Sequence, residues 1–144
     1  MIPFESVFAS SFQGLAVDVS SVTSIEWAVR NGNGTEVLFS TSVPPAYLVD
    51  DDGWVLQIWH NEPLRMNNAS SVSPGPWSEM LIRVASLVQD AVMDQLGRGW
   101  PELYDGHVFS GLLEPSVDDD GGLWWSLSTS RIVPVGQLDL LQIK

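Results

Sequence analysis

Residues 77–96 read WSEMLIRVASLVQDAVMDQL, and this stretch decides the fold class. Apolar side chains recur every three or four positions from Trp77 to Leu96, and polar side chains mostly fill the positions between them. Pro76 suits the first turn of a helix, and Gly97 suits the position just after its last turn. The stretch therefore predicts a long helix with one apolar face.

The N-terminal residues repeat this helical spacing over a shorter length. Their apolar side chains fall at Phe4, Val7, Phe8, Phe12 and Leu15. Gly14, near the end of the pattern, is a candidate stop, because glycine often follows the last turn of a helix. We expect a short N-terminal helix here.

Alternating and aromatic segments on either side of the long helix predict antiparallel strands. Ile25, Trp27 and Val29 alternate with polar or small residues, and the Asn/Gly-rich residues 31–34 then lead to a second segment at 35–40, which predicts a hairpin. Further strands are expected at 54–59, 123–127, 132–135 and 138–143. The order of elements predicts an α+β fold: an antiparallel sheet of hairpins packed against one long amphipathic helix, with a short N-terminal helix.

The chain has 144 residues, the length of one ordinary domain. Residues 61–76 are rich in asparagine and serine and end in Pro74-Gly75-Pro76. This composition predicts a linker that crosses the surface. Neither half has enough apolar sequence to form a core alone, so we expect a single α+β domain over residues 1–144.

Two acidic turns precede aromatic strands. Residues 50–53 and 118–121 both read Asp-Asp-Asp-Gly, and each turn is followed by tryptophan within four residues. Asp-Gly favours a hairpin turn, because glycine accepts positive φ and aspartate can hydrogen-bond to its own turn. We expect two hairpin tips on which carboxylates steer a partner and tryptophans anchor it. The predicted partner-binding residues are Asp50, Asp51, Asp52, Trp54, Asp118, Asp119, Asp120 and Trp124.

A calcium loop is one alternative for these turns. The EF-hand needs ligands at loop positions 1, 3 and 5, with glycine at position 6. Counted from Asp50, position 5 is Trp54, and counted from Asp118 it is Gly122, so neither loop fits. A cation site of another kind, using two or three of these oxygens, stays open beside solvated turns. The chain has no cysteine and hence no thiolate site, and we predict no metal and no cofactor.

Acid–base catalysis is a second alternative. Glu102, Asp105 and His107 lie near Trp100-Pro101, and His60 follows an aromatic strand. Each histidine is a candidate base, but each also fits a loop or a strand end. The chain lacks the Gly-x-Ser-x-Gly, Walker, dinucleotide and His-Glu-x-x-His patterns. We therefore predict no catalytic residue and no enzymatic activity.

Trp124 and Trp125 are adjacent in a predicted strand, so their side chains point to opposite faces. One is expected to pack under the long helix. The other lies on the far face, where it either meets a partner or is covered by the N-terminal helix.

The net charge of the chain limits the classes of partner that it can attract. Six basic residues against eighteen acidic ones give a net charge of −12, which repels nucleic acid and anionic membranes and attracts a basic protein. Acidity that only aids solubility is the simpler explanation. The N-terminus lacks the basic region of a signal peptide, so a cytoplasmic location is expected.

The stretch from Val84 to Leu138 resembles a group of small, uncharacterised actinobacterial proteins. The shared motifs are Trp100-Pro101-Glu102, Leu113-Glu114-Pro115, an acidic-Gly turn with a tryptophan strand, and Val135-Gly136-Gln137-Leu138. In those proteins we expect cysteines and histidines at positions that here correspond to Leu103 and Ser126, which cannot act as thiolate ligands. The resemblance implies a bacterial cytoplasmic protein and no known activity.

Charge, size and aromatic turns together favour a non-enzymatic acidic binding protein: an immunity or antitoxin-type inhibitor of a basic partner such as a toxin or nuclease. The alternative is a small structural or assembly subunit, a homodimer formed through the tryptophan-rich sheet. A third is an acidic hydrolase that uses Asp51, Asp119 or His107. The chain is expected to be a monomer or a homodimer.

Overall fold

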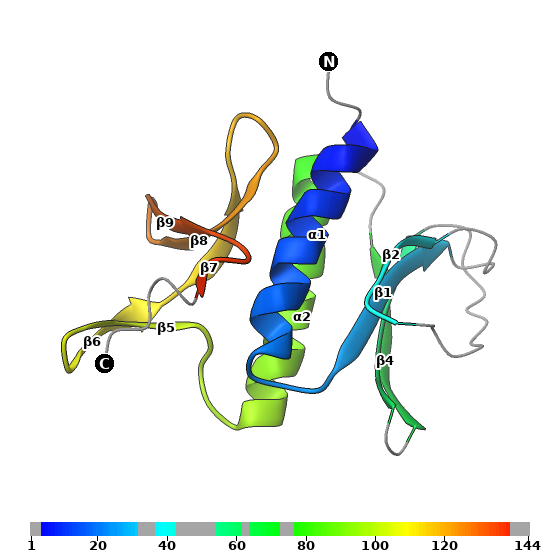
Figure 1. Ribbon diagram of the computed structural model, residues 1–144, viewed down its shortest axis with the longest axis horizontal. Helices are drawn as coiled ribbons and strands as arrows, with labels where there is room; N and C mark the ends of the chain where they lie inside the picture. The colour runs from blue at the N-terminus through cyan, green and yellow to red at the C-terminus, as the bar shows by residue number, and fades with distance from the viewer. Residues whose placement is uncertain (1–3, 32–36, 43–53, 62–63, 73–76, 139–144) are drawn as a thin grey trace.

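The computed structural model describes residues 4–31, 37–42, 54–61, 64–72 and 77–138. Helices α1 (Phe4–Ser20) and α2 (Trp77–Leu96) run side by side through the middle of the molecule (Figure 1). A four-stranded sheet lies on one side of these helices, and two smaller sheets lie on the other. The predicted α+β fold of antiparallel hairpins and helices is confirmed, with the strands divided among three sheets.

The four-stranded sheet has the order β2-β1-β3-β4, and all its pairs are antiparallel. Its strands are β1 (Glu26–Asn31), β2 (Val37–Ser40), β3 (Trp54–Asn61) and β4 (Leu64–Val72). The predicted hairpin forms as β1 and β2. Strand β3 pairs with β1 on one side and with β4 on the other. The first acidic turn, residues 50–53, lies outside the described residues.

Strand β4 corrects the prediction of a linker over residues 61–76. It pairs along β3 with Trp54 opposite Val72 and Asn61 opposite Leu64. Its sequence, LRMNNASSV, is polar because β4 is the last strand of its sheet, and an edge strand needs few apolar side chains when its backbone is paired. The prediction of a linker from composition is therefore wrong for residues 64–72.

The smaller sheets follow α2 in the chain. Strands β5 (Glu102–Asp105) and β6 (Val108–Leu112) form a two-stranded hairpin, and β7 (Glu114–Val117), β8 (Leu123–Leu127) and β9 (Ser130–Pro134) form the third sheet. The second acidic turn joins β7 to β8, as its Asp-Gly step predicts.

The β5–β6 hairpin forms over residues for which the sequence pattern predicts no strand. Gly106 and His107 form its turn between the paired residues Asp105 and Val108, with Gly106 at φ 65°. Its two ends are held together by the Leu113 N–H, which donates to the Pro101 carbonyl at 2.8 Å. The buried amide of Gln89 on α2 donates to the carbonyls of both Trp100 (2.9 Å) and Leu113 (2.7 Å), so α2 holds the base of the hairpin.

The helix ends show one correct and one wrong prediction. Gly97 has φ 71° and its N–H donates to the Met93 carbonyl at 2.8 Å, so it terminates α2 as expected. Gly14 does not terminate α1, which continues to Ser20. A Cβ on Gly14 would lie 2.5 Å from the carbonyl oxygen of Val135, so glycine is needed there for close packing of the C-terminal segment.

Aromatic clusters pack on both sides of the helices. Phe12 of α1 meets Trp27 of β1 edge to face at 5.6 Å between ring centroids. On the other side Trp100 meets Trp125 of β8 edge to face at 5.3 Å. These tryptophans are buried, so the core runs from one sheet, through the helices, to the opposite sheet.

Candidate functional site

Asp18, on the last turns of α1, is a buried carboxylate that contacts the C-terminal part of the chain. Its Oδ2 accepts hydrogen bonds from the Trp125 indole N–H (2.9 Å) and the Gly136 N–H (2.6 Å), and its Oδ1 accepts from the Leu138 N–H (3.3 Å). Three N–H donors compensate for the desolvation of the carboxylate. This group joins α1 to β8 and to the segment after β9, and it has a structural role.

The acidic turn (118–122) is built around Asp118. Its Oδ1 accepts from the N–H groups of Asp120 and Gly122, both at 2.9 Å, and its Oδ2 accepts from the Trp124 indole N–H at 2.8 Å. Burial raises the pKa of Asp118, but the hydrogen bonds from Trp124, Gly122 and Asp120, with the charge of Arg131, outweigh burial and hold the pKa below its ordinary value. Asp118 therefore shapes the turn.

Apart from Asp118, the predicted partner-binding residues fall into three groups. Asp119 and Asp120 are exposed at the tip of the acidic turn. Trp54 packs partly buried against the core, and Trp124 is partly buried beside Asp118. Asp50, Asp51 and Asp52 lie outside the described residues.

The β5–β6 hairpin (102–112) exposes apolar side chains that sequence reasoning missed. Val108 is 69% exposed, Phe109 53% and Tyr104 39%, and the rings of Tyr104 and Phe109 meet across the strands at 5.6 Å. In Figure 1 this hairpin extends away from the helices. Asp105-Gly106 between aromatic and branched residues was the signal that could have identified it.

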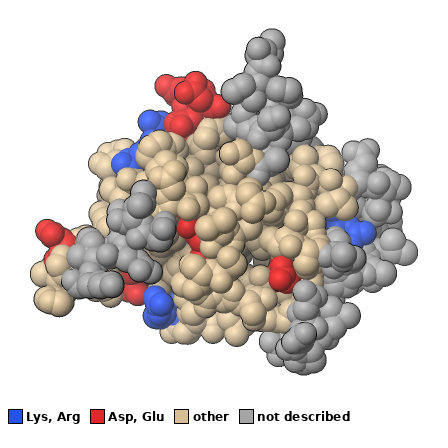
Figure 2. All heavy atoms as spheres, viewed as in Figure 1, with Lys and Arg blue, Asp and Glu red and all other residues tan. Residues whose placement is uncertain are grey.

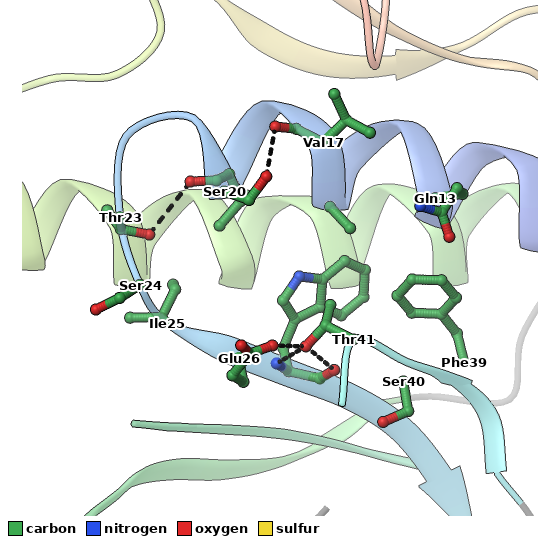
Figure 3. Close-up of a pocket in the computed structure, with 13 residues that line it drawn as sticks. Gln13, Val17, Ser20, Thr23, Ser24, Ile25, Glu26, Phe39, Ser40 and Thr41 are labelled. Atoms are coloured by element: carbon green, nitrogen blue, oxygen red, sulfur yellow. Dashed lines mark hydrogen bonds between the residues drawn. The ribbon is translucent and has the colours of Figure 1, made fainter. Parts of the chain in front are cut away.

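A pocket of about 510 Å³ lies between the end of α1 and strands β1 and β2 (Figure 3). Gln13, Val17 and Ser20 of α1 line one side, and Glu26, Phe39 and Thr41 line the strand side. The hydroxyl of Thr41 donates to Glu26 Oε2 and contacts the Trp27 carbonyl. This volume falls in the usual range of small-ligand sites.

The residues considered for acid–base chemistry do not converge on this pocket. Glu102 pairs with Arg98 at 3.0 Å, and His107 is exposed in the turn of the β5–β6 hairpin. His60 is buried in β3, and its Nε2 has no hydrogen-bond partner among the residues described. Nor do these residues include a group of three His, Cys, Asp or Glu side chains placed to hold a metal ion.

Exposed carboxylates outnumber exposed cations in the described chain. The exposed acidic residues are Glu79, Asp90, Asp94, Asp105, Glu114, Asp119 and Asp120, and the exposed basic residues are Arg83, Arg98 and Arg131. On the face shown in Figure 2, carboxylates gather most densely at the upper edge, where Figure 1 places the turn between β7 and β8. The described surface thus keeps the acidic excess of the whole chain.

Comparisons with protein families, with curated proteins and with solved structures find no match. The resemblance suggested for residues 84–138 therefore stays a prediction. Of the described helices, neither α1 nor α2 is long and apolar enough to cross a membrane.

Proposed function

We propose that this chain is a non-enzymatic binding protein for a basic protein partner. The observation that carries the proposal is the β5–β6 hairpin, where Tyr104, Val108 and Phe109 present apolar and aromatic surface to solvent. Aromatic side chains are enriched at protein interfaces, and exposed apolar clusters on soluble proteins often mark such interfaces. In this proposal the hairpin supplies the apolar surface that contacts the partner.

Charge supplies the preference for a basic partner. The chain carries a net charge of −12. The exposed carboxylates of the described residues include Asp105 beside the hairpin turn and Glu114 just after the hairpin. A field of one sign increases the rate at which an oppositely charged protein associates, and salt screens this effect. The partner should therefore associate fast at low ionic strength and markedly more slowly at high ionic strength.

The class of binding protein that fits best is an immunity or antitoxin-type inhibitor, acting in a bacterial cytoplasm on a basic toxin or nuclease. This rests on analogy with acidic inhibitors that cover the basic surfaces of nucleases. Size, acidity and the exposed hairpin support it. The exposed tip residues Asp119 and Asp120 serve in steering, whereas Asp118 maintains the turn that carries them.

An assembly subunit that dimerises through the tryptophan-rich sheet is the alternative. Trp27, Trp59, Trp100 and Trp125 are buried within the chain, and Trp54 and Trp124 are partly buried, so the described tryptophans leave little indole surface for a second copy. Sedimentation at low and high salt separates the two proposals. A dimer that persists at every salt concentration favours assembly, and a monomer favours the inhibitor.

The test uses the wild-type protein as bait in extracts at low salt, with each captured protein then purified and its association rate measured. Phe109→Ser should weaken binding, whereas Val37→Ser, a matched change of an exposed residue on β2, should not. Asp119→Asn with Asp120→Asn should slow association and reduce its salt dependence. If no basic protein binds at low salt, or if Phe109→Ser and Val37→Ser behave alike, the proposal is wrong.

A further inference from the structure

The pocket between α1 and strands β1 and β2 contains one ionisable side chain. Its lining residues are Gln13, Ala16, Val17, Val19, Ser20, Thr23, Ser24, Ile25, Glu26, Trp27, Phe39, Ser40 and Thr41. Glu26 is the charged group in this set, and no cationic side chain among the residues described pairs with it. A carboxylate beside a pocket, with no cationic partner among the described residues, is available to a ligand.

The end of α1 adds negative potential to the same space. Ala16, Val17, Val19 and Ser20 belong to the last turns of α1 and line the pocket. The carbonyl end of a helix carries partial negative charge, and a cation placed there is stabilised. No basic residue of α1 occupies the last turn, so this helix supplies no cation at its own carbonyl end.

Aromatic and aliphatic side chains form one part of the wall, and hydroxyl and amide side chains complete the lining. Phe39 and Trp27 lie with ring centroids 4.8 Å apart at 40°, and Ile25 and Val19 lie beside them in the lining. Val17, on the helix side, is 49% exposed. Such walls bury the apolar stem of a ligand, and aromatic faces also attract cations.

We infer that this pocket binds a cationic nitrogen on a short apolar stem, a primary ammonium or a guanidinium. The cation lies between Glu26 and the carbonyl end of α1, and the stem lies against Phe39 and Trp27. Thr41 orients the carboxylate, because its hydroxyl donates to Glu26 Oε2. The inference concerns the isolated chain, so it holds whether or not a basic protein is the partner.

The test measures binding of benzylammonium to the full chain at pH 7 by titration calorimetry and by backbone amide chemical shifts. We expect millimolar-range affinity, about 1 mM for a ligand of this size. Benzyl alcohol, the neutral analogue, should bind about tenfold more weakly or not at all. Shifts should fall on residues 13–27 and 39–41.

Glu26→Gln is the decisive variant, because it removes the charge and keeps an oxygen to accept from Thr41. It should weaken benzylammonium binding about tenfold or more. Glu79→Gln removes an exposed carboxylate of α2 outside the pocket and should bind as the wild type does. Phe39→Leu should weaken binding of the cation more than that of benzyl alcohol, because it removes the aromatic face and keeps apolar volume.

Two probes separate the sources of such a cation. Agmatine represents a free small amine, and N-acetyl-arginine methylamide represents an arginine side chain of a protein. Binding of the arginine derivative to the same residues assigns the pocket to a protein side chain. Binding of agmatine or benzylammonium alone assigns it to a free amine. Equal affinity for benzylammonium and benzyl alcohol, unchanged binding by the folded Glu26→Gln variant, or shifts confined to other residues would overturn the inference.

Discussion

Adjacent tryptophans of β8 donate their indole N–H groups to two aspartates in opposite settings. Trp124 donates to Asp118, six residues earlier in the chain, and Trp125 donates to Asp18, on α1. Each carboxylate also accepts two backbone N–H groups. The hydrogen-bonding pattern is nearly the same, but Asp118 organises one turn and Asp18 joins distant parts of the fold.

This difference shows how similar side-chain chemistry can have local or global consequences. Asp118 lies at a partly exposed turn, where water can replace a lost partner. Asp18 is 3% exposed, and its donors are 107 to 120 residues away in the chain. A donor left unpaired in the core costs the full desolvation of that group, whereas one at the surface costs much less.

Substitution of Asp18 should have the largest effect. In Asp18→Asn the amide nitrogen replaces an acceptor and faces an N–H donor from Trp125, Gly136 or Leu138. We expect the free energy of unfolding to fall by about 3 kcal/mol or more. Urea unfolding followed by far-UV circular dichroism measures this. Asp118→Asn is the matched control, and equal losses in the two variants would remove the distinction between them.

Gly14→Ala tests the same junction by sterics. In a free helix this change stabilises by about 1 kcal/mol, because alanine has the higher helix propensity. Here the new Cβ would lie 2.5 Å from the Val135 carbonyl oxygen, so we expect a loss of about 1–3 kcal/mol. Gln13→Ala, at an exposed position on α1, serves as control. A gain in stability for Gly14→Ala would show that the C-terminal segment does not pack closely on α1.

Asp118→Asn should cost about 1 kcal/mol near neutral pH, since the asparagine oxygen can still accept from the turn while Trp124 loses its carboxylate. The pKa of Asp118 is lowered in the folded state, so its stabilisation is fully present above the unfolded pKa of about 3.9. It is lost as pH falls through the lower folded pKa. The stability difference between wild type and variant should thus be constant from pH 5 to 8 and shrink below pH 4. A pH-independent difference would contradict the lowered pKa.

Asp119→Asn with Asp120→Asn should have the smallest effect on folding. Both side chains are exposed, and the turn uses the backbone N–H of Asp120 and not its carboxylate. We expect the free energy of unfolding to change by less than about 0.5 kcal/mol. Urea unfolding followed by far-UV circular dichroism, as for Asp18→Asn, measures this change. A large loss would assign all of the triplet to the structure of the turn, which would then be unsuitable for steering.

The parts of the fold that the sequence predicts correctly are those that follow from local sequence patterns. The 3.6-residue period of 77–96 gives α2, and the Asp-Gly step at 120–121 gives the β7–β8 turn. The opposite faces of Trp124 and Trp125 follow from strand geometry, and Trp125 is indeed buried while Trp124 is partly exposed. These features depend on neighbours in the chain.

The features that the sequence did not predict depend on partners far away in the chain, or lie in segments whose composition is typical of another structure. β4 is polar, and it forms because β3 offers a free edge. Asp18 reads as one polar residue of a helix until Trp125 and Gly136 are placed beside it. The pocket around Glu26 likewise needs α1, β1 and β2 together, so no single segment predicts it.

The buried amide of Gln89 has a consequence for how the chain can diversify. It hydrogen-bonds to the carbonyls of Trp100 and Leu113, and Leu113 donates to Pro101, so the chain leaves the core and returns at nearly one point. Residues 102–112 therefore project from a fixed stem, with Tyr104, Val108 and Phe109 exposed. In the proposed function, substitutions of its exposed side chains would change recognition, whereas Leu103, which packs against the core, belongs to the scaffold.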